Sequence, residues 1–422
     1  MLHPGFHKAL AYLSSDNVRS LLMDLVDISS PTGNEIGVAQ YLIARMRRIG
    51  METDLPLVDA GRPNAIGHRR GHGHGLNLLF TGHMDTSYSG AEEHLAGEGF
   101  QPKAIHRDGW VWGLGANNMK SGLAAALSAI EAIAAAGIEL PGDISFAGVV
   151  GEIEKTAVEE FQGVEYSGYG IGTRHLVTHG VTADFALLAE PTGLKIAIAN
   201  MGVVWLRITV RGTVAHSALA NRPNVVNAIA VMHELQSDIA QWARDYEAKH
   251  EYMGERANVT IAAIRGGAPW RLSRNPHECS LYLDIRTVPG QSIEDVKRDL
   301  RRVLRAFGER KGIPEPAMHI YVTDPPVVLD RDFAVVEALG RARQAVTGEA
   351  PSFIIRRPGA DAVHLTAYGV PCIIFGPGGR MHPDAGGAGM HAFGEHVLVE
   401  DCVTAAKIYL ALALDLCSRN AP

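Results

Sequence analysis

The chain is poor in cysteine, and its cysteines are not paired. Its four cysteines (Cys279, Cys372, Cys402 and Cys417) are spread through a sequence of 422 residues, and no two of them form a CxxC pair. This usage argues against a disulfide framework and against a zinc ribbon. It fits reduced thiols in a cytosolic protein.

The sequence also lacks a hydrophobic run long enough to cross a membrane. Its most apolar stretch, Leu123–Gly137, is interrupted by Ser128 and Glu131 and is shorter than the roughly 20 residues that a spanning helix needs. The segment Met1–Leu10 has neither the apolar core nor the small-residue cleavage site of a signal peptide. We therefore expect a cytoplasmic protein with no membrane partner.

An excess of positive charge is absent as well. Lys and Arg total 39 against 46 Asp and Glu, which gives a net charge of -7 with neutral histidines. Nucleic-acid binders usually carry a concentrated basic patch, whereas Arg69-Arg70 and Arg301-Arg302 are short and far apart in the sequence. We therefore expect no nucleic-acid partner.

What the chain does have is the length and patterning of a two-domain α/β protein. Up to about residue 196, apolar strands alternate with helices, and polar residues follow the strands, as in an α/β sheet with its site at one edge. From there the apolar and polar residues alternate, as in Val204–Val210, which indicates half-exposed antiparallel strands. We expect a first domain over residues 1–196 and 318–422, split by an inserted α+β domain over residues 197–317.

Several polar residues follow apolar strands or glycine turns. They are His83 and Asp85, Asn117 and Asn118, Glu152 and Glu154, Glu190, and His391. A histidine with an aspartate two residues later suits a metal site, because the imidazole supplies one nitrogen ligand and the carboxylate can hold the other ring nitrogen. The recurrence of such residues through the chain favours a metal-dependent hydrolase.

Eight segments of the chain resemble a known family, from about residue 20 to the C-terminus. They are LLFTGHMDT, GLGANNMKSG, VVGEIEKT, LLAEPT, GTVAHSA, DIRTVPG, IIFGPGG and GMHAFGEHVLVED. They are similar, in the same order, to the family of acetylornithine deacetylase, succinyl-diaminopimelate desuccinylase and carboxypeptidase G. The resemblance implies a split zinc-exopeptidase-like catalytic domain, an inserted ferredoxin-like dimerisation domain, and two zinc-type ions that share a bridging carboxylate.

The resemblance also implies roles for five residues of the first domain. His83 and Glu190 match ligands of one ion, and Asp85 matches the aspartate that supports the histidine. Glu152 matches the general base that takes a proton from the attacking water, and His391 matches a ligand of the second ion.

Three further residues match groups that act on the substrate in that family. His216 matches a histidine that reaches into the active site of the partner subunit and stabilises the developing oxyanion. Arg286 resembles an arginine that grips a substrate carboxylate, and Gly378 lies in a turn that positions the bound acyl group. A histidine at a hairpin end and an arginine exposed on a strand remain the structural alternatives for His216 and Arg286.

The chain departs from the family at two ligand positions. The bridging aspartate falls on Asn118, and a glutamate ligand of the second ion falls on Ile153. Two ions close together would then be nearly unneutralised. We therefore expect one labile ion per subunit, Mn²⁺, Zn²⁺ or Co²⁺, held by His83, Asn118 and Glu190, with His391 free to act on the substrate. Entry of Glu154 as a replacement ligand is the alternative.

The function expected from these residues is hydrolysis of a C–N bond in a small carboxylate-bearing substrate, as in amidohydrolases, deacylases and exopeptidases. An alternative within the resembled family is an aminohydrolase that replaces the ring amine of 5-nitroanthranilate with hydroxyl. A second alternative is an inactive binding protein of the same fold. Retention of Glu152, Asp85 and His216 argues against that alternative, because a dead site has no need of them. We expect a homodimer or a higher homo-oligomer.

Overall fold

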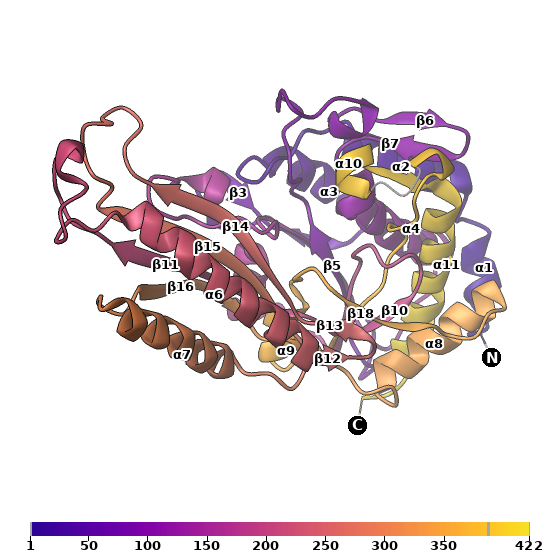
Figure 1. The fold of residues 1–422 in the computed structure, drawn as a ribbon. Coiled ribbons are helices and arrows are strands. Elements are labelled where there is room, and N and C mark those ends of the chain that lie inside the picture. The colour runs from indigo at the N-terminus through magenta and orange to yellow at the C-terminus, as the bar shows by residue number, and fades with distance from the viewer. Residues whose placement is uncertain (1, 386–388, 422) are drawn as a thin grey trace. The chain divides into compact units, whose positions relative to one another are not determined.

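The computed structural model describes residues 2–385 and 389–421, without the side chains of residues 391 and 392. The chain forms two compact units (Figure 1). The first unit comprises Met1–Ile198, Leu329–Ile354 and Ala360–Pro422, and the second comprises Ala199–Val328 and Ile355–Gly359. The expected α/β fold with an inserted second unit is confirmed.

The first unit is built on a mixed β-sheet whose neighbouring strands follow the order β1-β4-β8-β5-β9-β19-β10. Strand β10 also pairs with two short strands, β17 and β18. The bounds are β1 (Glu52–Asp54), β4 (Ala65–Arg69), β5 (Leu78–His83), β8 (Ile144–Val149), β9 (Phe185–Leu188), β10 (Ile196–Asn200), β17 (Val327–Val328), β18 (Phe353–Arg356) and β19 (Cys372–Ile374).

The parallel strands in the middle of this sheet explain why the polar residues predicted from the sequence lie at one edge of it. Strands β8, β5, β9 and β19 are parallel neighbours, so their carboxyl ends lie at one edge. Strands β5 and β8 are buried along their whole length, and most residues of their sequences, LLFTGH and ISFAGV, are apolar or glycine. Asp85, Glu152 and Glu190 follow β5, β8 and β9 within a few residues, and this edge is where ligands bind in open α/β sheets.

Helices of the first unit pack around this sheet, and α4 and α11 lie against each other. The bounds are α1 (Phe6–Leu10), α2 (Ser15–Val26), α3 (Ile36–Arg48), α4 (Ser121–Ala135), α5 (Ile171–Thr178), α8 (Ala334–Thr347), α9 (Ala362–Ala367), α10 (Met390–Phe393) and α11 (Val399–Leu416). Helix α4 approaches the end of β9 so closely that a Cβ atom on Gly122 would lie 1.9 Å from the carbonyl oxygen of Ala189. Glycine at this position therefore allows the helix start to reach the sheet edge.

Three small sheets lie outside the two large ones in the part of the chain that the structure describes. They contain β2 (Leu57–Asp59) with β3 (Arg62–Pro63), β12 (Glu251–Tyr252) with β13 (Glu255–Arg256), and β20 (His396–Leu398) with β7 (Trp110–Trp112) and β6 (Ile105–Arg107). Within the described residues, no helix has both the length and the apolar character that crossing a membrane requires.

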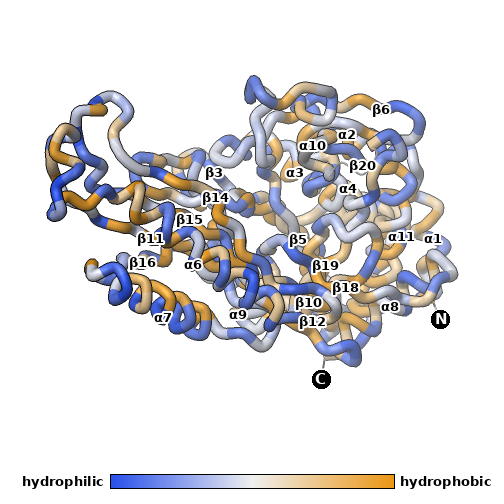
Figure 2. Tube along the Cα trace, viewed as in Figure 1, coloured by the Kyte–Doolittle hydropathy of each residue, from blue (hydrophilic) through white to orange (hydrophobic). Residues whose placement is uncertain are grey.

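The second unit is a four-stranded antiparallel sheet with two helices packed against it. The strand order is β14-β15-β11-β16, with bounds β11 (Gly202–Arg211), β14 (Asn258–Gly266), β15 (Glu278–Thr287), β16 (Ala317–Asp324), α6 (Ala228–Lys249) and α7 (Ile293–Lys311). Helix α7 is amphipathic, and hydrophilic and hydrophobic residues are interspersed along it (Figure 2). It begins with a capping box between Ser292 and Asp295 and buries its apolar stripe, which includes Leu300 and Leu304.

The second unit extends further along the chain than the sequence pattern predicted. Strand β16 pairs with β11 in the antiparallel sheet, although residues 318–422 were expected to return to the first domain. The strand is half-exposed along most of its length, and in its sequence AMHIYVTD the apolar residues Met318, Ile320 and Val322 alternate with more polar ones. Such an alternation predicts a strand but does not say which of two sheets the strand joins, so its sheet is hard to assign from sequence.

Candidate functional site

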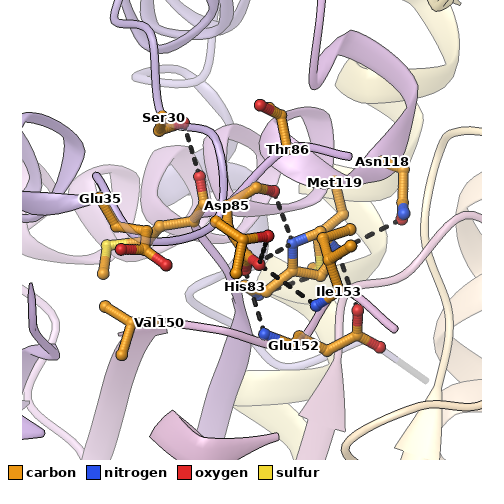
Figure 3. A network of polar contacts seen from close by, with 12 residues as sticks. Ser30, Glu35, His83, Asp85, Thr86, Asn118, Met119, Val150, Glu152 and Ile153 are labelled. Atoms are coloured by element: carbon orange, nitrogen blue, oxygen red, sulfur yellow. Dashed lines mark hydrogen bonds and ion pairs between the residues drawn. The ribbon is translucent and has the colours of Figure 1, made fainter. Parts of the chain in front are cut away.

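His83 ends strand β5 and is fully buried at the edge of the sheet. Its Nδ1 lies 2.9 Å from the main-chain carbonyl oxygen of Asp85. A proton on Nδ1, donated to this carbonyl, leaves the lone pair of Nε2 available as a ligand. Asn118 and Glu152 lie on the Nε2 side of the ring (Figure 3).

Oxygen atoms of three side chains surround Nε2 of His83. The distances are 3.4 Å to Oδ1 of Asn118, 3.6 Å to Oε1 of Glu190 and 3.7 Å to Oε2 of Glu152. The ligand atoms of His83, Glu152 and Glu190 all lie within 4.8 Å of one another, and the three residues are buried. One imidazole and two carboxylates form a donor set that suits a divalent transition metal, so the residues fit the ion that the sequence predicted.

The electrostatics of the site also favour a cation. Burial alone would lower the pKa of His83, but the charges of Glu152, Glu190 and Asp85 outweigh it and raise this pKa well above the usual value. Three carboxylates therefore face a single imidazole, which can carry only one positive charge. A divalent ion would balance the remaining negative charge.

The carboxylate of Asp85 acts mainly on the main chain rather than on the imidazole. Oδ1 accepts the N–H of Glu152 at 3.1 Å, and Oδ2 accepts the N–H of Ile153 at 3.2 Å and the hydroxyl of Thr32 at 2.9 Å. Its distance to Nδ1 of His83 is 3.5 Å, longer than the bond from Nδ1 to the carbonyl oxygen. Burial would raise the pKa of Asp85, but His83 and these donors lower it.

Asn118 and Ile153 leave the centre with neutral groups where the resembled family has carboxylates. The amide oxygen of Asn118 is within reach of Nε2 of His83, as described above. The side chain of Ile153 is buried and offers no ligand atom. Asn118 belongs to the helical turn Ala116–Lys120, directly before α4, although its own backbone (φ -123°, ψ 96°) is not helical.

Glu395, which the sequence interpretation did not single out, holds this helical turn. Its Oε2 accepts the N–H groups of Asn117 at 3.2 Å and Asn118 at 3.0 Å. The side chain of Asn117 in turn accepts the N–H of Gly379 at 2.7 Å, and a Cβ atom on Gly378 would lie 2.6 Å from the carbonyl oxygen of Asn117. Gly378 therefore lies beside the segment that carries Asn118. The only signal for Glu395 was its place in the tail GMHAFGEHVLVED.

The predicted residues His391 and Glu154 also belong to the first unit. His391 lies in α10, but its side chain is outside the described residues. Glu154 is half-buried, and among the described residues it is not part of the group that can hold a metal. Both Glu152 and Glu154 follow the end of β8 at Val149, so the two do not share a strand face.

His216 and Arg286 belong to the second unit. His216 is exposed and caps the short helical turn Ser217–Leu219, because its Nδ1 accepts the N–H of Ala218 at 3.1 Å. Arg286, on β15, is mostly buried and donates two hydrogen bonds to Oδ2 of Asp284, at 2.8 and 3.2 Å. A substrate carboxylate at Arg286 would therefore share the guanidinium with Asp284.

Sequence comparison gives curated relatives along nearly the whole chain. A deformylase of N-formyl-4-amino-5-aminomethyl-2-methylpyrimidine from Bacillus subtilis is 25% identical and aligns over 92% of this chain and 91% of its own length. A succinyl-diaminopimelate desuccinylase from Gluconacetobacter diazotrophicus is 29% identical over 93% of this chain and 95% of its own.

Solved structures show the same fold at low sequence identity. A tripeptidase from Staphylococcus aureus superposes with a TM-score of 0.75 at 19% identity, covering 97% of this chain and all of its own. Human carnosine dipeptidase 1 gives a TM-score of 0.73 at 16% identity, over 99% of this chain and all of its own.

The family model of the peptidase family M20/M25/M40 matches residues 79–415, a range that contains every residue of the buried His83, Glu152 and Glu190 group. Its members use divalent metal ions, which agrees with the donor set at the sheet edge. The alternative of an inactive binding protein is thereby set aside. The chain belongs to the peptidase family M20/M25/M40 and is a metal-dependent hydrolase that acts on C–N bonds.

Proposed function

We propose that the protein removes an acyl group from the nitrogen of a small carboxylate-bearing substrate, using one labile divalent ion per chain. The single observation that carries this proposal is the buried group of His83, Glu152 and Glu190, with neutral Asn118 and Ile153 beside it. The names of the deformylase and desuccinylase relatives support acyl removal rather than peptide cleavage. Mn²⁺, Zn²⁺ and Co²⁺ all suit this donor set.

In this proposal His83, Asn118 and Glu190 hold the ion, and Glu152 serves as the general base. When bound, the ion would polarise the scissile carbonyl and acidify water at the site. Glu152 takes the proton of the attacking water and delivers it to the leaving nitrogen. The hydrogen bonds from the N–H groups of Glu152 and Ile153 to Asp85 fix the main chain beside the base.

The direct test combines metal analysis with the variant Glu152→Gln, assayed on N-formyl, N-acetyl and N-succinyl amino acids. We expect one ion per chain in both proteins and a loss of turnover of about 10²–10⁴-fold in the variant, because general-base catalysis contributes that much. Loss of the ion from Glu152→Gln would make Glu152 a ligand instead. Two tightly bound ions in the wild-type protein would contradict the single-ion proposal.

A second candidate is the aminohydrolase reaction on an aromatic amine such as 5-nitroanthranilate. The replacement of two carboxylates by Asn118 and Ile153 favours it, because one ion could bind the adjacent amine and carboxylate of such a substrate. Ammonia release from 5-nitroanthranilate, compared with amine release from the N-acyl amino acids, separates the two reactions.

We also propose a cytoplasmic homodimer. The four cysteines are free and buried, which fits a reducing compartment. His216 is exposed, as a residue that reaches into the active site of a partner subunit would be. In this proposal Arg286, which is mostly buried, binds a substrate carboxylate next to Asp284. In this proposal Gly378 and His391 also bind the substrate.

A further inference from the structure

We propose that the buried ion pair of Glu35 and Arg62 is a positioning device that holds Glu152 in the site from two sides. The inference rests on the proposed role of Glu152 as the general base. Neither residue belongs to the group of His83, Glu152 and Glu190 that can hold a metal, and neither was singled out by the sequence.

Glu35 and Arg62 form a two-point ion pair with no exposure to solvent. Nε of Arg62 lies 2.9 Å from Oε2 of Glu35, and Nη2 lies 2.6 Å from Oε1. Both side chains are 0% exposed, and Asp59 is the next carboxylate, at 3.8 Å from Nη1. Burying two charges is costly, and a buried pair is best explained where it fixes one arrangement of the chain.

The Arg62 side of the pair holds the end of the loop that carries Glu152. Nη1 of Arg62 donates to the carbonyl oxygens of Ser167 at 2.9 Å and Val164 at 3.3 Å. A Cβ atom on Gly151 would lie 2.6 Å from Nη2, so the guanidinium packs directly against the residue before Glu152. Gly151 has a φ of +63°, which favours glycine at this close approach.

The loop itself is closed by main-chain hydrogen bonds. The N–H groups of Gly168, Tyr169 and Gly170 donate to the carbonyl oxygens of Lys155, Ile153 and Gly151, respectively. The segments 151–155 and 167–170 therefore run side by side, with Glu152 in the first and the Ser167 carbonyl in the second. A shift of Arg62 would be transmitted across these bonds.

The Glu35 side of the pair holds the turn that supports Asp85. Oε1 of Glu35 accepts the N–H of Gly33 at 3.1 Å, next to Thr32, whose hydroxyl donates to Asp85. Asp85 in turn accepts the N–H groups of Glu152 and Ile153. The same ion pair thus reaches the Glu152 main chain through the turn on one side and through Ser167 on the other.

The test uses Arg62→Lys, which keeps the charge but cannot make the two-point bond to Glu35 together with the bond to Ser167. Hydrogen–deuterium exchange of the full-length protein should show lost protection at the amides of Glu152 and Ile153, while α11 keeps its protection. With an N-acyl amino acid that the wild type hydrolyses, kcat should fall by up to about 100-fold at nearly constant KM, because displacement of a catalytic group by an ångström costs about that much.

The matched control is Arg45→Lys. Arg45 makes a similar two-point pair with Glu131, at 3.0 and 2.9 Å, between α3 and α4 and away from the Glu152 loop. This variant should leave the Glu152 amides and kcat unchanged. If Arg62→Lys does not fold, Glu35→Asp, which keeps both charges, tests the same contacts.

Three outcomes would overturn the inference. They are unchanged exchange at Glu152 in Arg62→Lys, equal loss of protection in Arg45→Lys, and lost protection with unchanged kcat. If the wild type hydrolyses no N-acyl amino acid, the proposed function fails. The exchange experiment still decides whether the pair holds the loop.

Discussion

At the scale of single residues, Asn118 and Ile153 set the charge of the centre. They are neutral, so the carboxylates that remain near His83 are Glu152 and Glu190 on the Nε2 side of the ring and Asp85 on the Nδ1 side. Each carboxylate added at these positions would offset one charge of a second ion.

The double variant Asn118→Asp, Ile153→Glu should therefore bind a second ion per chain. Plasma mass spectrometry after dialysis against Mn²⁺ or Zn²⁺ measures the stoichiometry, with the wild type as the one-ion reference. A control variant, Asn117→Asp, places the carboxylate one residue away, where the side chain holds Gly379, and should not add an ion. Unchanged stoichiometry in the double variant would show that these positions are not ligand positions.

Asp361 gives the first unit a pH-dependent stability. It is buried, accepts a hydrogen bond from the Thr173 hydroxyl at 2.5 Å, and has its pKa raised by burial to about 7. Between the unfolded value of 3.8 and this value, the folded state holds a proton that the unfolded state releases. The free energy of unfolding therefore falls by about 1.4 kcal/mol per pH unit across the window and is level above it.

The variant Asp361→Asn removes this titration and should gain stability over the wild type as the pH rises through the window. Denaturant unfolding with chelator present, near pH 4 and near pH 8, measures the difference, which should be much larger at the higher pH. A difference that does not depend on pH would mean that Asp361 is ionised in the folded protein. Asp415→Asn, at the surface beside Arg419, is the control that should show little effect.

At the scale of elements, Glu395 links the C-terminal segment to the turn before α4. Glu395→Gln keeps the shape of the side chain but weakens both bonds to the Asn117 and Asn118 amides, because the acceptor loses its charge. We expect a loss of about 1 kcal/mol in the free energy of unfolding, and weaker Mn²⁺ binding as Asn118 becomes less well placed. Calorimetric titration with Mn²⁺ measures the second effect.

The control for Glu395 is Glu98→Gln. Glu98 pairs with Arg107 at the surface, where both side chains are about half exposed, and such pairs contribute little. The two variants should differ clearly in Mn²⁺ affinity. Equal affinities would remove Glu395 from its positioning role.

Elements were predictable from sequence where a repeat marks them, but the point where one unit gives way to the other was not. The alternation over Val204–Val210 predicted an antiparallel strand, and β11 (Gly202–Arg211) contains this stretch. Strand β16 also alternates, but it was assigned to the first domain, because the pattern of a strand does not say which sheet the strand joins.

The candidate site was predictable where a residue carries its own chemistry, and not where it acts through the main chain. His83, Glu152 and Glu190 were expected at the sheet edge and do meet there. Arg62 and Glu395 bind carbonyl and N–H groups, which every residue has, so no sequence pattern announces their partners.

At the scale of the whole molecule, the second unit offers a surface for self-association. Strand β14 is an edge strand, and most of its residues are exposed, including Ile264 at 55%. The loop after it exposes Trp270 and Leu272, both at 82%. An exposed edge with apolar side chains is a template for pairing with another chain, so this face supports the proposed homodimer.

The variant Ile264→Lys should convert the dimer to a monomer, because a charge on an edge strand opposes pairing with a second edge. Light scattering behind size-exclusion chromatography should give twice the mass of one chain for the wild type and one chain mass for the variant. Leu57→Lys, at a residue 65% exposed in the first unit, is the matched control and should stay dimeric. A wild-type protein that is monomeric at every concentration would refute the dimer, whereas a dimeric Ile264→Lys would place the interface on another surface.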